Sequence, residues 1–364
     1  MSLKCGIVGL PNVGKSTLFN SLSSARAEAA NFPFCTIEPN IGIITVPDER
    51  LDILTALVKP EKTIPTVIEF VDIAGLVKGA SKGEGLGNKF LANIREVDAI
   101  LHVVRCFEDP NVVHVDGRID PVKDKEIIDI ELQLKDLDSI EKRIQRLQKS
   151  VKSGDPQIKK ELAIVEKYKH TLEEGKNVRS LDSAELDRSV VEDLYLLTDK
   201  PVIYVANVDE ASLDGNEMTK KLEAIAKAEN AELVIVCAAL EAQIAELESV
   251  EEKAEFLQEY GLKESGLNRL IKASYHLLDL ITYFTAGPKE VRAWTIHRGW
   301  KAPQAAGVIH SDFEKGFIKA EVIKLENYLT YKTEQACKEA GKLAIEGKEY
   351  VVQDGDIMHF RFNV

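Results

Sequence analysis

A glycine-rich segment near the start of the chain constrains the fold most strongly. It reads Gly9-Leu-Pro-Asn-Val-Gly14-Lys15-Ser16-Thr17, follows an apolar run from Leu3 to Val8 and opens a helix-compatible stretch. A strand, a glycine loop and a helix in this order point backbone N–H groups at the phosphates of a nucleoside triphosphate. The pattern predicts a P-loop NTPase.

Each residue type in this loop has a predicted role. Gly9 and Gly14 allow a close backbone approach to the phosphates that a Cβ would block. Lys15 is a compact charge that can reach the β- and γ-phosphates during catalysis, and the Ser16 hydroxyl suits Mg²⁺. The nucleotide-binding residues predicted here are Asn12, Val13, Gly14, Lys15, Ser16 and Thr17. The alternative is a chance match in a glycine-rich turn.

A second motif supplies the remaining phosphate and metal groups. Asp72-Ile-Ala-Gly75 directly follows the apolar run from Val67 to Val71. Asp72 is predicted to hold the Mg²⁺ shell, and Gly75 to bring a backbone amide to the terminal phosphate. Thr36 is the predicted hydroxyl for the remaining metal position, on the order of elements alone. An acid-initiated turn is the alternative for Asp72.

Six apolar, β-branched runs indicate a doubly wound α/β sheet, since helix-compatible segments lie between most of them. They are Leu3–Val8, Ile41–Val46, Val67–Val71, Ala99–Val104, Pro201–Ala206 and Leu233–Val236. Such sheets bind ligands at the carboxyl ends of their strands, and the glycine loop follows the first run. We therefore predict a nucleotide-binding domain formed by residues 1–122 and 200–280.

Residues 123–199 interrupt this alternation. Apolar residues recur there at steps of three and four, from Ile127 to Val151 and again from Ile158 to Leu172, with Gly154-Asp155-Pro156 between them. This pattern predicts an antiparallel helical hairpin, with a third helix beginning near Asp182. The narrow apolar stripe favours a projecting arm over a crossover pair packed on the sheet.

Residues 281–364 have the character of a compact α+β module. Strands are predicted at Val291–Ile296, Gly316–Val322, Tyr350–Val352 and Asp356–Phe362, with an Asp-Gly turn before the last. The module carries 12 Lys and Arg against 11 Asp and Glu residues, so it is much less acidic than the rest. Its aromatic and basic residues could contact RNA or form a sheet core with a charged rim. They are Arg292, Trp294, Arg298, Trp300 and Lys301.

Three long strings resemble the Obg-related class of P-loop translation factors, and within it the YchF/Ola-type members. They are the glycine loop, Asn31-Phe-Pro-Phe-Cys-Thr-Ile-Glu-Pro39 and the stretch from Val71 to Gly87. The resemblance covers essentially the whole chain. It implies the helical insertion, a C-terminal module similar to the ubiquitin-like TGS domain, use of ATP and a partnership with the ribosome or its RNA.

The base-recognition segment departs from that of ordinary GTPases. Asn-Lys-x-Asp is replaced by Asn207-Val208-Asp209-Glu210, in which the longer Glu210 must redirect to reach guanine and Val208 cannot lie along the base as a lysine stem does. Adenine has no donor at N1 and loses little, so we predict ATP over GTP, although Asp209 could supply the carboxylate. After the sixth run, Cys237 and Ala238 occupy the place where related proteins contact the base.

Hydrolysis needs a group other than the usual glutamine, because Leu76 follows the Asp-x-x-Gly motif. We predict that His114, in the loop after the fourth run, orients water or accepts a proton; a structural or solvated histidine is the alternative. By resemblance to relatives that lack the glutamine, Asn12 could bind K⁺ beside the phosphates. A turn-forming amide is the simpler role.

Composition limits the remaining possibilities. The absence of an apolar run of 18 residues or of a leader-like start predicts a chain without a signal peptide or membrane span, and five scattered cysteines suit a reducing cytoplasm. A net charge of −13 argues against coating nucleic acid, so no DNA partner is predicted. Much of the acid lies in Glu241–Glu259, which is most simply a solvated helical face.

The predicted function is a Mg²⁺-dependent, ATP-hydrolysing molecular switch that contacts the translation machinery. One alternative is a GTPase of the same fold. Another is a ribosome- or protein-binding adaptor in which the nucleotide is a structural ligand. A metabolic kinase is less favoured, because the sequence offers no evident second-substrate site.

Overall fold

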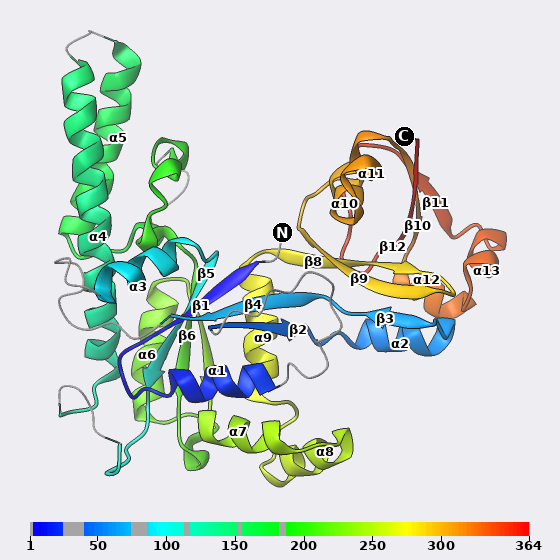
Figure 1. Cartoon of the computed structure of the whole chain (residues 1–364), viewed down its shortest axis with the longest axis horizontal. Coiled ribbons are helices and arrows are strands. Elements are labelled where there is room, and N and C mark those ends of the chain that lie inside the picture. The colour runs from blue at the N-terminus through cyan, green and yellow to red at the C-terminus, as the bar shows by residue number, and fades with distance from the viewer. Residues whose placement is uncertain are drawn as a thin grey trace. The chain divides into compact units, whose positions relative to one another are not determined.

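The computed structural model describes residues 3–24, 40–73, 86–112, 117–151, 155–181 and 187–363. The chain divides into two compact units. The first comprises Met1–Ile44 and Glu69–Ala273, and the second comprises Thr45–Ile68 and Ser274–Val364. Each unit has its own sheet (Figure 1).

The sheet of the first unit has the strand order β2-β4-β1-β5-β6-β7. Its strands are β1 (Lys4–Val8), β2 (Ile41–Thr45), β4 (Val67–Asp72), β5 (Ala99–Arg105), β6 (Val202–Asn207) and β7 (Glu232–Val236). The neighbouring pairs from β4 through β7 are parallel. All six predicted runs are confirmed as strands, and so is the doubly wound α/β class.

The central strands are buried on both faces, because helices pack on the sheet. Every residue of β5 and β6 is buried, which explains why these strands appear in the sequence as continuous apolar runs. The helices of this layer are α1 (Lys15–Ser24), α3 (Leu86–Arg95), α6 (Glu217–Ala228), α7 (Ala238–Glu246), α8 (Val250–Glu259) and α9 (Gly266–Leu277). The parallel strands bring the glycine loop, Asp72 and Asn207 to one edge of the sheet.

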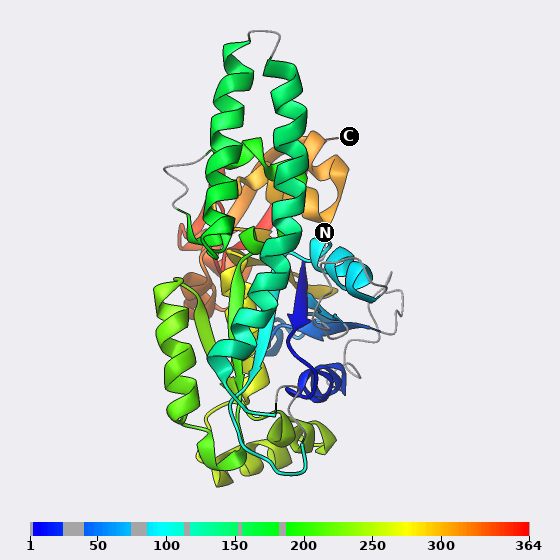
Figure 2. The same ribbon diagram turned by 90° about the vertical axis from the view of Figure 1, so that its left-hand side faces the viewer.

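The predicted hairpin forms two long helices, α4 (Pro121–Ser150) and α5 (Pro156–Glu173). Asp120 and Asp155 cap their N-termini, and each is followed by a proline in the first helical turn. The distal part of the hairpin has its own core, formed mainly by Ile140, Ile144, Val165 and Tyr168. Figure 2 shows the two helices side by side and extending away from the sheet, as expected of a projecting arm.

The root of the arm packs differently from its tip. Ile128 and Leu132 of α4 are fully buried near β5 and α6, so this part does lie on the sheet layer. The predicted third helix starts outside the described residues, since 182–186 are not among them. Residues 187–199, which are described, form 3₁₀ turns and no α-helix: Arg188–Val190, Glu192–Leu194 and Leu197–Asp199. That prediction is wrong for the part that can be seen.

The second unit is an α+β module around a sheet of order β11-β10-β12-β8-β9-β3. Its strands are β3 (Lys62–Ile64), β8 (Leu280–Ala286), β9 (Glu290–His297), β10 (Phe317–Ile323), β11 (Leu343–Glu346) and β12 (Ile357–Phe362). Its helices are α2 (Glu49–Val58), α10 (Ala302–Ile309), α11 (Ser311–Lys315), α12 (Leu325–Tyr331) and α13 (Glu334–Glu339). The α+β prediction is confirmed, and the TGS-type assignment stays a prediction.

Residues 45–68 belong to this second unit, whereas the sequence pattern placed them in the nucleotide-binding domain. Leu51 and Leu54 of α2 are buried against β8 and β9, and β3 extends the sheet by pairing with β9 in parallel. The Arg50 Nη1 atom also lies 2.8 Å from Asp354 Oδ2. That the arm forms a domain of its own stays a prediction.

One strand prediction in this unit is wrong. Tyr350–Val352 is not a strand: Val351 makes one isolated bridge to Lys301, and the Tyr350 N–H donates to the Gly347 carbonyl at 3.2 Å. The strand beside β10 is instead Leu343–Glu346, a half-exposed edge strand without a clear apolar run.

The aromatic and basic set of this unit contributes mainly to its core and rim. Trp294 is 9% exposed, its Nε1 donates to Thr285 Oγ1 at 3.0 Å, and the Arg292 guanidinium stacks 3.8 Å from the ring centroid. Trp300 packs against the same core. The sheet-core alternative is therefore correct for both tryptophans.

Candidate nucleotide site

The glycine loop between β1 and α1 has the backbone conformation expected of a phosphate cradle. Asn12 and Gly14 both have positive φ, 61° and 97°. A Cβ on Gly14 would lie 2.2 Å from Asn207 Nδ2, and one on Gly9 would lie 2.4 Å from the Val103 carbonyl oxygen. Both positions therefore require glycine, because side-chain or backbone atoms already occupy the space.

Lys15 is a buried cation at the first position of α1. Its side chain is 7% exposed, and Nζ donates to the Leu10 carbonyl at 2.6 Å, which closes the loop on itself. Burial lowers the Lys15 pKa to about 8, and the nearby Asp72 opposes this shift. Loss of water around an ammonium group disfavours its charged form, so an anion placed here would be strongly favoured.

Asp72 ends β4 at the same edge of the sheet. Its Oδ1 atom is buried and has no hydrogen-bond partner among the described residues. Burial raises the Asp72 pKa, and Lys15 opposes that shift. A buried carboxylate oxygen without a partner is costly unless a cation or donor joins it, so this atom is a candidate metal ligand.

The other predicted metal and phosphate groups are only partly visible. Ser16 and Thr17 are exposed at the start of α1, where they can meet a ligand. Thr36 and Gly75 lie outside the described residues. Across the described part of the chain, no group of three or more His, Cys, Asp or Glu side chains could hold a metal. A metal here would therefore depend on hydroxyl and phosphate oxygens as well as Asp72.

Asn207 joins the glycine loop to the base-recognition loop. Its Nδ2 donates to the Val13 carbonyl at 2.9 Å, and its Oδ1 accepts from the Ala238 N–H at 3.0 Å. Val208 is 2% exposed, and its N–H donates to the Val236 carbonyl at 2.9 Å. The predicted residues Val13, Asn207, Val208 and Ala238 thus form one connected structure, next to the buried Cys237. The sequence also predicts that Asn207 bonds the base through N7 or an exocyclic amino group, and this contact stays a prediction.

Glu210 has partners that the sequence did not indicate. Its Oε1 accepts from Gln243 Nε2 at 3.1 Å, and its Oε2 accepts from the Tyr260 hydroxyl at 3.4 Å. Gln243 lies on α7, and Tyr260 follows the last turn of α8. No local motif links the three residues, so only the folded structure brings them together.

The loop after β5, which leads toward His114, is held by Arg105. This side chain is 1% exposed and donates to the carbonyls of Phe107, Asp109 and Val112 at 3.1, 3.2 and 2.9 Å. Its guanidinium also lies 4.6 Å from the Phe107 ring centroid. His114 itself is outside the described residues, so its catalytic role stays a prediction.

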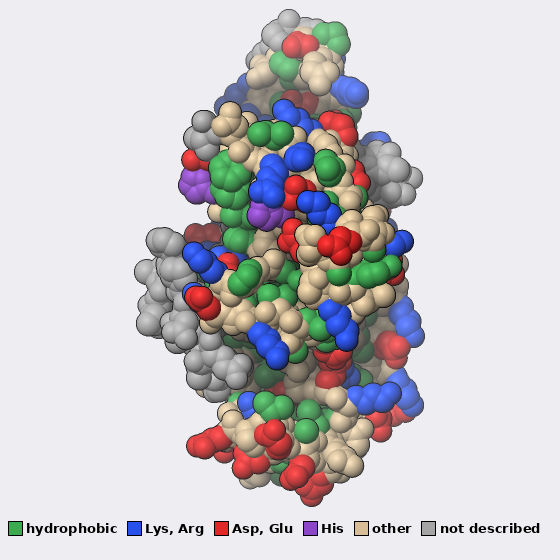
Figure 3. Space-filling model, turned by 90° about the vertical axis from the view of Figure 1, so that its right-hand side faces the viewer, with side chains coloured by type: hydrophobic (Ala, Val, Ile, Leu, Met, Phe, Trp, Pro, Cys, Tyr) green, Lys and Arg blue, Asp and Glu red, His purple; other side chains and the backbone are tan. Residues whose placement is uncertain are grey.

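The acidic helices α7 and α8 are mostly a solvated face, as predicted. Acidic side chains gather at the lower end of Figure 3, where these helices lie. The exposed acidic side chains between Glu241 and Glu259 are Glu246, Glu248, Glu251, Glu252, Glu255 and Glu259. Glu241 is the exception: it is 2% exposed and accepts from the Gly266 N–H at 2.6 Å, at the first residue of α9. Burial raises its pKa to about 7, against the effect of this hydrogen bond.

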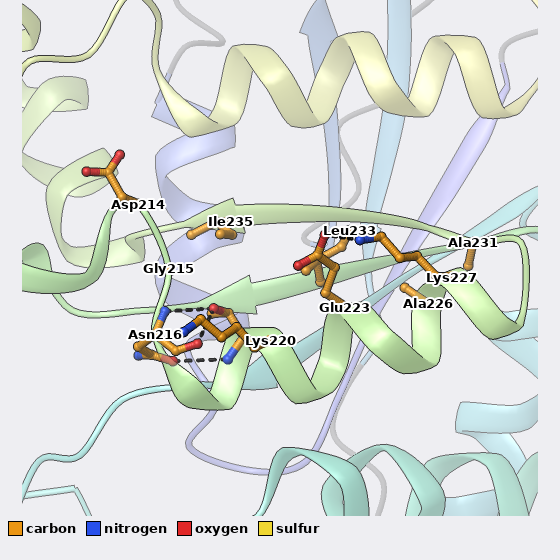
Figure 4. Close-up of a pocket in the computed structure, with 11 residues that line it drawn as sticks. Asp214, Gly215, Asn216, Lys220, Glu223, Ala226, Lys227, Ala231, Leu233 and Ile235 are labelled. Atoms are coloured by element: carbon orange, nitrogen blue, oxygen red, sulfur yellow. Dashed lines mark hydrogen bonds and ion pairs between the residues drawn. The ribbon is translucent and has the colours of Figure 1, made fainter.

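A cavity of about 500 Å³ lies along α6 and β7 (Figure 4). Asn216 is near one end and Ala231 near the other, with Leu233 and Ile235 contributed by β7. None of the predicted nucleotide-site residues lines it. The charges along it alternate, from Asp214 through Lys220 and Glu223 to Lys227, so it has no net preference for an anion.

Comparisons with known proteins identify the family of the chain. Residues 4–150 match a family model described as "50S ribosome-binding GTPase", and residues 280–363 match the YchF-GTPase C-terminal model, described as a protein of unknown function. The chain is 60% identical over 364 residues to "Ribosome-binding ATPase YchF" of Haemophilus ducreyi, with all of both chains covered. The chain belongs to the YchF family.

Other YchF proteins agree over the same length. The Bacillus subtilis protein of the same name is 58% identical over 367 residues, with both chains fully covered. The solved "Structure of the Schizosaccharomyces pombe YchF GTPase" is 42% identical, with a TM-score of 0.89 over 99% of this chain and 98% of that one. The predicted family and the P-loop fold are therefore confirmed. No described helix is both long enough and apolar enough to cross a membrane.

Proposed function

We propose that this protein is a molecular switch that binds and hydrolyses ATP and associates with the ribosome. The base-recognition loop is the observation that carries the choice of ATP. Val208 is buried, and its N–H donates to the Val236 carbonyl of β7. The Glu210 carboxylate accepts from Gln243 of α7 and from Tyr260 at the end of α8, so it is not positioned like the shorter aspartate of GTPases. Guanine needs a carboxylate that accepts from N1–H and the 2-amino group, whereas adenine has no donor at N1.

The names of the curated relatives support ATP and the ribosome, whereas the two family models carry GTPase in their names or descriptions. The curated bacterial YchF proteins are named ribosome-binding ATPases, whereas the fission yeast protein of known structure is named a GTPase. We favour ATP, because the Glu210 and Val208 arrangement argues against guanine. A GTPase of the same fold is the alternative.

Mg²⁺ is the proposed cofactor, and the residues present fit it. The Ser16 hydroxyl and the Asp72 carboxylate are hard oxygen groups at the phosphate end of the site, and Asp72 Oδ1 has no partner among the described residues. When bound, the ion neutralises charge on the phosphates. Lys15 binds the β- and γ-phosphates, and the loop amides orient them. Thr36 and Gly75 are proposed to complete this set, and K⁺ beside Asn12 is a second candidate cation.

Hydrolysis is proposed to use His114, since Leu76 has no polar atom that could orient water. Arg105 fixes residues 107–112, the described part of the loop that leads to His114. His114→Ala with full turnover and intact binding would remove the assignment. A cytoplasmic location is proposed with it, because the buried residues Cys106, Cys237 and Cys337 are free thiols.

A nucleotide panel tests the proposal. The full chain is titrated with ATP, ADP, GTP and GDP in potassium buffer with Mg²⁺, and turnover is compared in K⁺ and Na⁺. We expect ATP to bind more tightly than GTP, and GTP binding about tenfold tighter would reverse the assignment. Ribosome sedimentation with an ATP analogue and with ADP then separates a switch from an adaptor: equal affinities would favour the adaptor.

A further inference from the structure

Two neutral donors hold the carboxylate of Glu210. Gln243 Nε2 donates to one oxygen and the Tyr260 hydroxyl to the other. The two donors come from different helical segments, at α7 and at the end of α8, so together they define the direction of the carboxylate. We call this pair, Gln243 and Tyr260, the Glu210 brace.

The brace lies beside the base-recognition loop. Glu210 begins the short 3₁₀ turn Glu210–Ser212, which follows the buried Val208. Cys237, the residue before α7, also lies close by: burial raises its pKa, and the Glu210 charge acts in the same direction. Desolvation and then Glu210 raise the Tyr260 pKa, so its hydroxyl keeps its proton and acts as the donor at neutral pH.

The surroundings explain why this carboxylate needs neutral donors. Glu241 lies close enough to act on Cys237 and Glu259 close enough to act on Tyr260, so further acidic side chains lie near the site. Repulsion alone would leave the flexible Glu210 side chain without a preferred direction. An amide and a phenol can hold it without adding charge, and they occupy both of its oxygens.

We propose that Gln243 and Tyr260 are positioning residues for nucleotide specificity, which hold Glu210 in an arrangement that disfavours guanine. Each carboxylate oxygen can accept more than one hydrogen bond, so the brace acts through direction: guanine must bring its N1–H and 2-amino groups to the remaining lone pairs in the orientation that Gln243 and Tyr260 fix, or displace these donors. Adenine makes no such demand, so its binding is little affected. This inference rests on the proposed ATP-dependent function and identifies what enforces its preference.

The test is equilibrium binding of Mg-ATP and Mg-GTP to the full chain. Tyr260→Phe and Gln243→Ala are made singly and together, with and without Glu210→Ala. The double brace variant is expected to lower the ratio of the GTP and ATP dissociation constants by about 3- to 10-fold, while ATP affinity changes by less than about twofold. In the Glu210→Ala background the same two substitutions should leave the ratio unchanged, because they act through Glu210.

A matched pair controls for general surface effects. Tyr195→Phe removes a hydroxyl from a tyrosine that is 66% exposed and follows the turn Glu192–Leu194, and Gln258→Ala removes an exposed amide from α8. Both should leave the ratio unchanged, and thermal melts confirm that each variant folds. An unchanged ratio in the double brace variant, or an equal change without Glu210, overturns the brace alone. A wild-type chain that binds no purine triphosphate overturns the proposed function together with the brace.

Discussion

Two lysines of the first unit are almost equally buried, yet their surroundings shift their pKa values in opposite directions. Lys15 in the glycine loop is 7% exposed and Lys125 at the root of the arm is 6% exposed. Burial lowers the Lys15 pKa to about 8, with only Asp72 in opposition. Burial also acts on Lys125, but Asp129 and Glu229 outweigh it, and the Lys125 pKa is raised.

The arm root satisfies its charges internally. Lys125 Nζ lies 2.7 Å from Asp129 Oδ2 and also contacts Glu229. The Arg179 guanidinium lies 3.5 Å from Asp129 and 3.6 Å from Glu229, and the Tyr204 hydroxyl donates to Glu229 at 2.7 Å. The network therefore joins α4 to β6 and to the end of α6 through charges that are paired in the protein itself.

The nucleotide site leaves the equivalent groups incomplete. The Lys15 ammonium contacts a backbone carbonyl, and Asp72 Oδ1 has no partner among the described residues. The difference teaches that burial of a charge does not by itself mark a binding site. The informative feature is a buried charge whose partner has to come from outside the chain.

The largest expected effect is at the arm root. Asp129→Ala removes the acid shared by Lys125 and Arg179, and we expect it to cost about 3–5 kcal/mol of unfolding free energy, because two buried cations lose a partner. Urea unfolding measures the loss. Asp138→Ala is the matched control on the same helix, since Asp138 is about half exposed and its pair with Lys142 should contribute little.

Asp72→Ala sharpens the same comparison. Because Asp72 is incompletely paired, Asp72→Ala should reduce the unfolding free energy by much less than Asp129→Ala does. An equal loss in both variants would mean that Asp72 is a structural charge, and the distinction between the two regions would fail.

The next largest expected effect is on the affinity for Mg-ATP. Lys15→Ala is expected to weaken Mg-ATP binding by roughly 100-fold, because a charge-assisted contact to phosphate in a dry site is lost. Its thermal midpoint should be unchanged or higher, since the buried ammonium is unfavourable without an anion. Isothermal titration calorimetry and a thermal melt make the two measurements. Unchanged affinity for every purine triphosphate would contradict the phosphate cradle.

Local sequence patterns were sufficient for much of this architecture. Strands such as β5 and β6 are buried on both faces, so each forms an apolar run that can be recognised without knowledge of its neighbours. The long hairpin carries its own apolar stripe and proline-marked helix starts. The glycine loop requires glycine at fixed positions, so its place in the chain could be predicted from the residue types alone.

Long-range packing decided what the sequence could not indicate. The segment 45–68 joins the second unit because Leu51 and Leu54 fit a core built from residues more than 200 positions away, such as Phe284 and Val291. The edge strand β11 lacks an apolar pattern, because its residues are half-exposed or exposed. The Glu210 brace comes from positions 33 and 50 residues further along, so no local spacing marks it.

The smallest predicted effect is the pH dependence of ATP binding, and it tests the Lys15 environment most directly. Without nucleotide, Lys15 has a pKa of about 8 and loses its proton above that pH. Phosphate charge raises the pKa in the complex, so binding takes up a proton above pH 8, and affinity should fall by up to about tenfold per pH unit there. Below pH 8 both states carry the proton, and this linkage disappears. Calorimetry in two buffers of different ionisation enthalpy measures the uptake at pH 8.5.

Lys15→Arg is the matched control for this linkage, because a guanidinium stays protonated throughout the range. Its affinity for ATP is expected to be lower than that of the wild type but independent of pH above 8. Equal proton uptake by the wild type and by Lys15→Arg would assign the titration to another group. In that case the two buried lysines would no longer differ in the way that the comparison requires, since Lys15 would already be as well paired as Lys125.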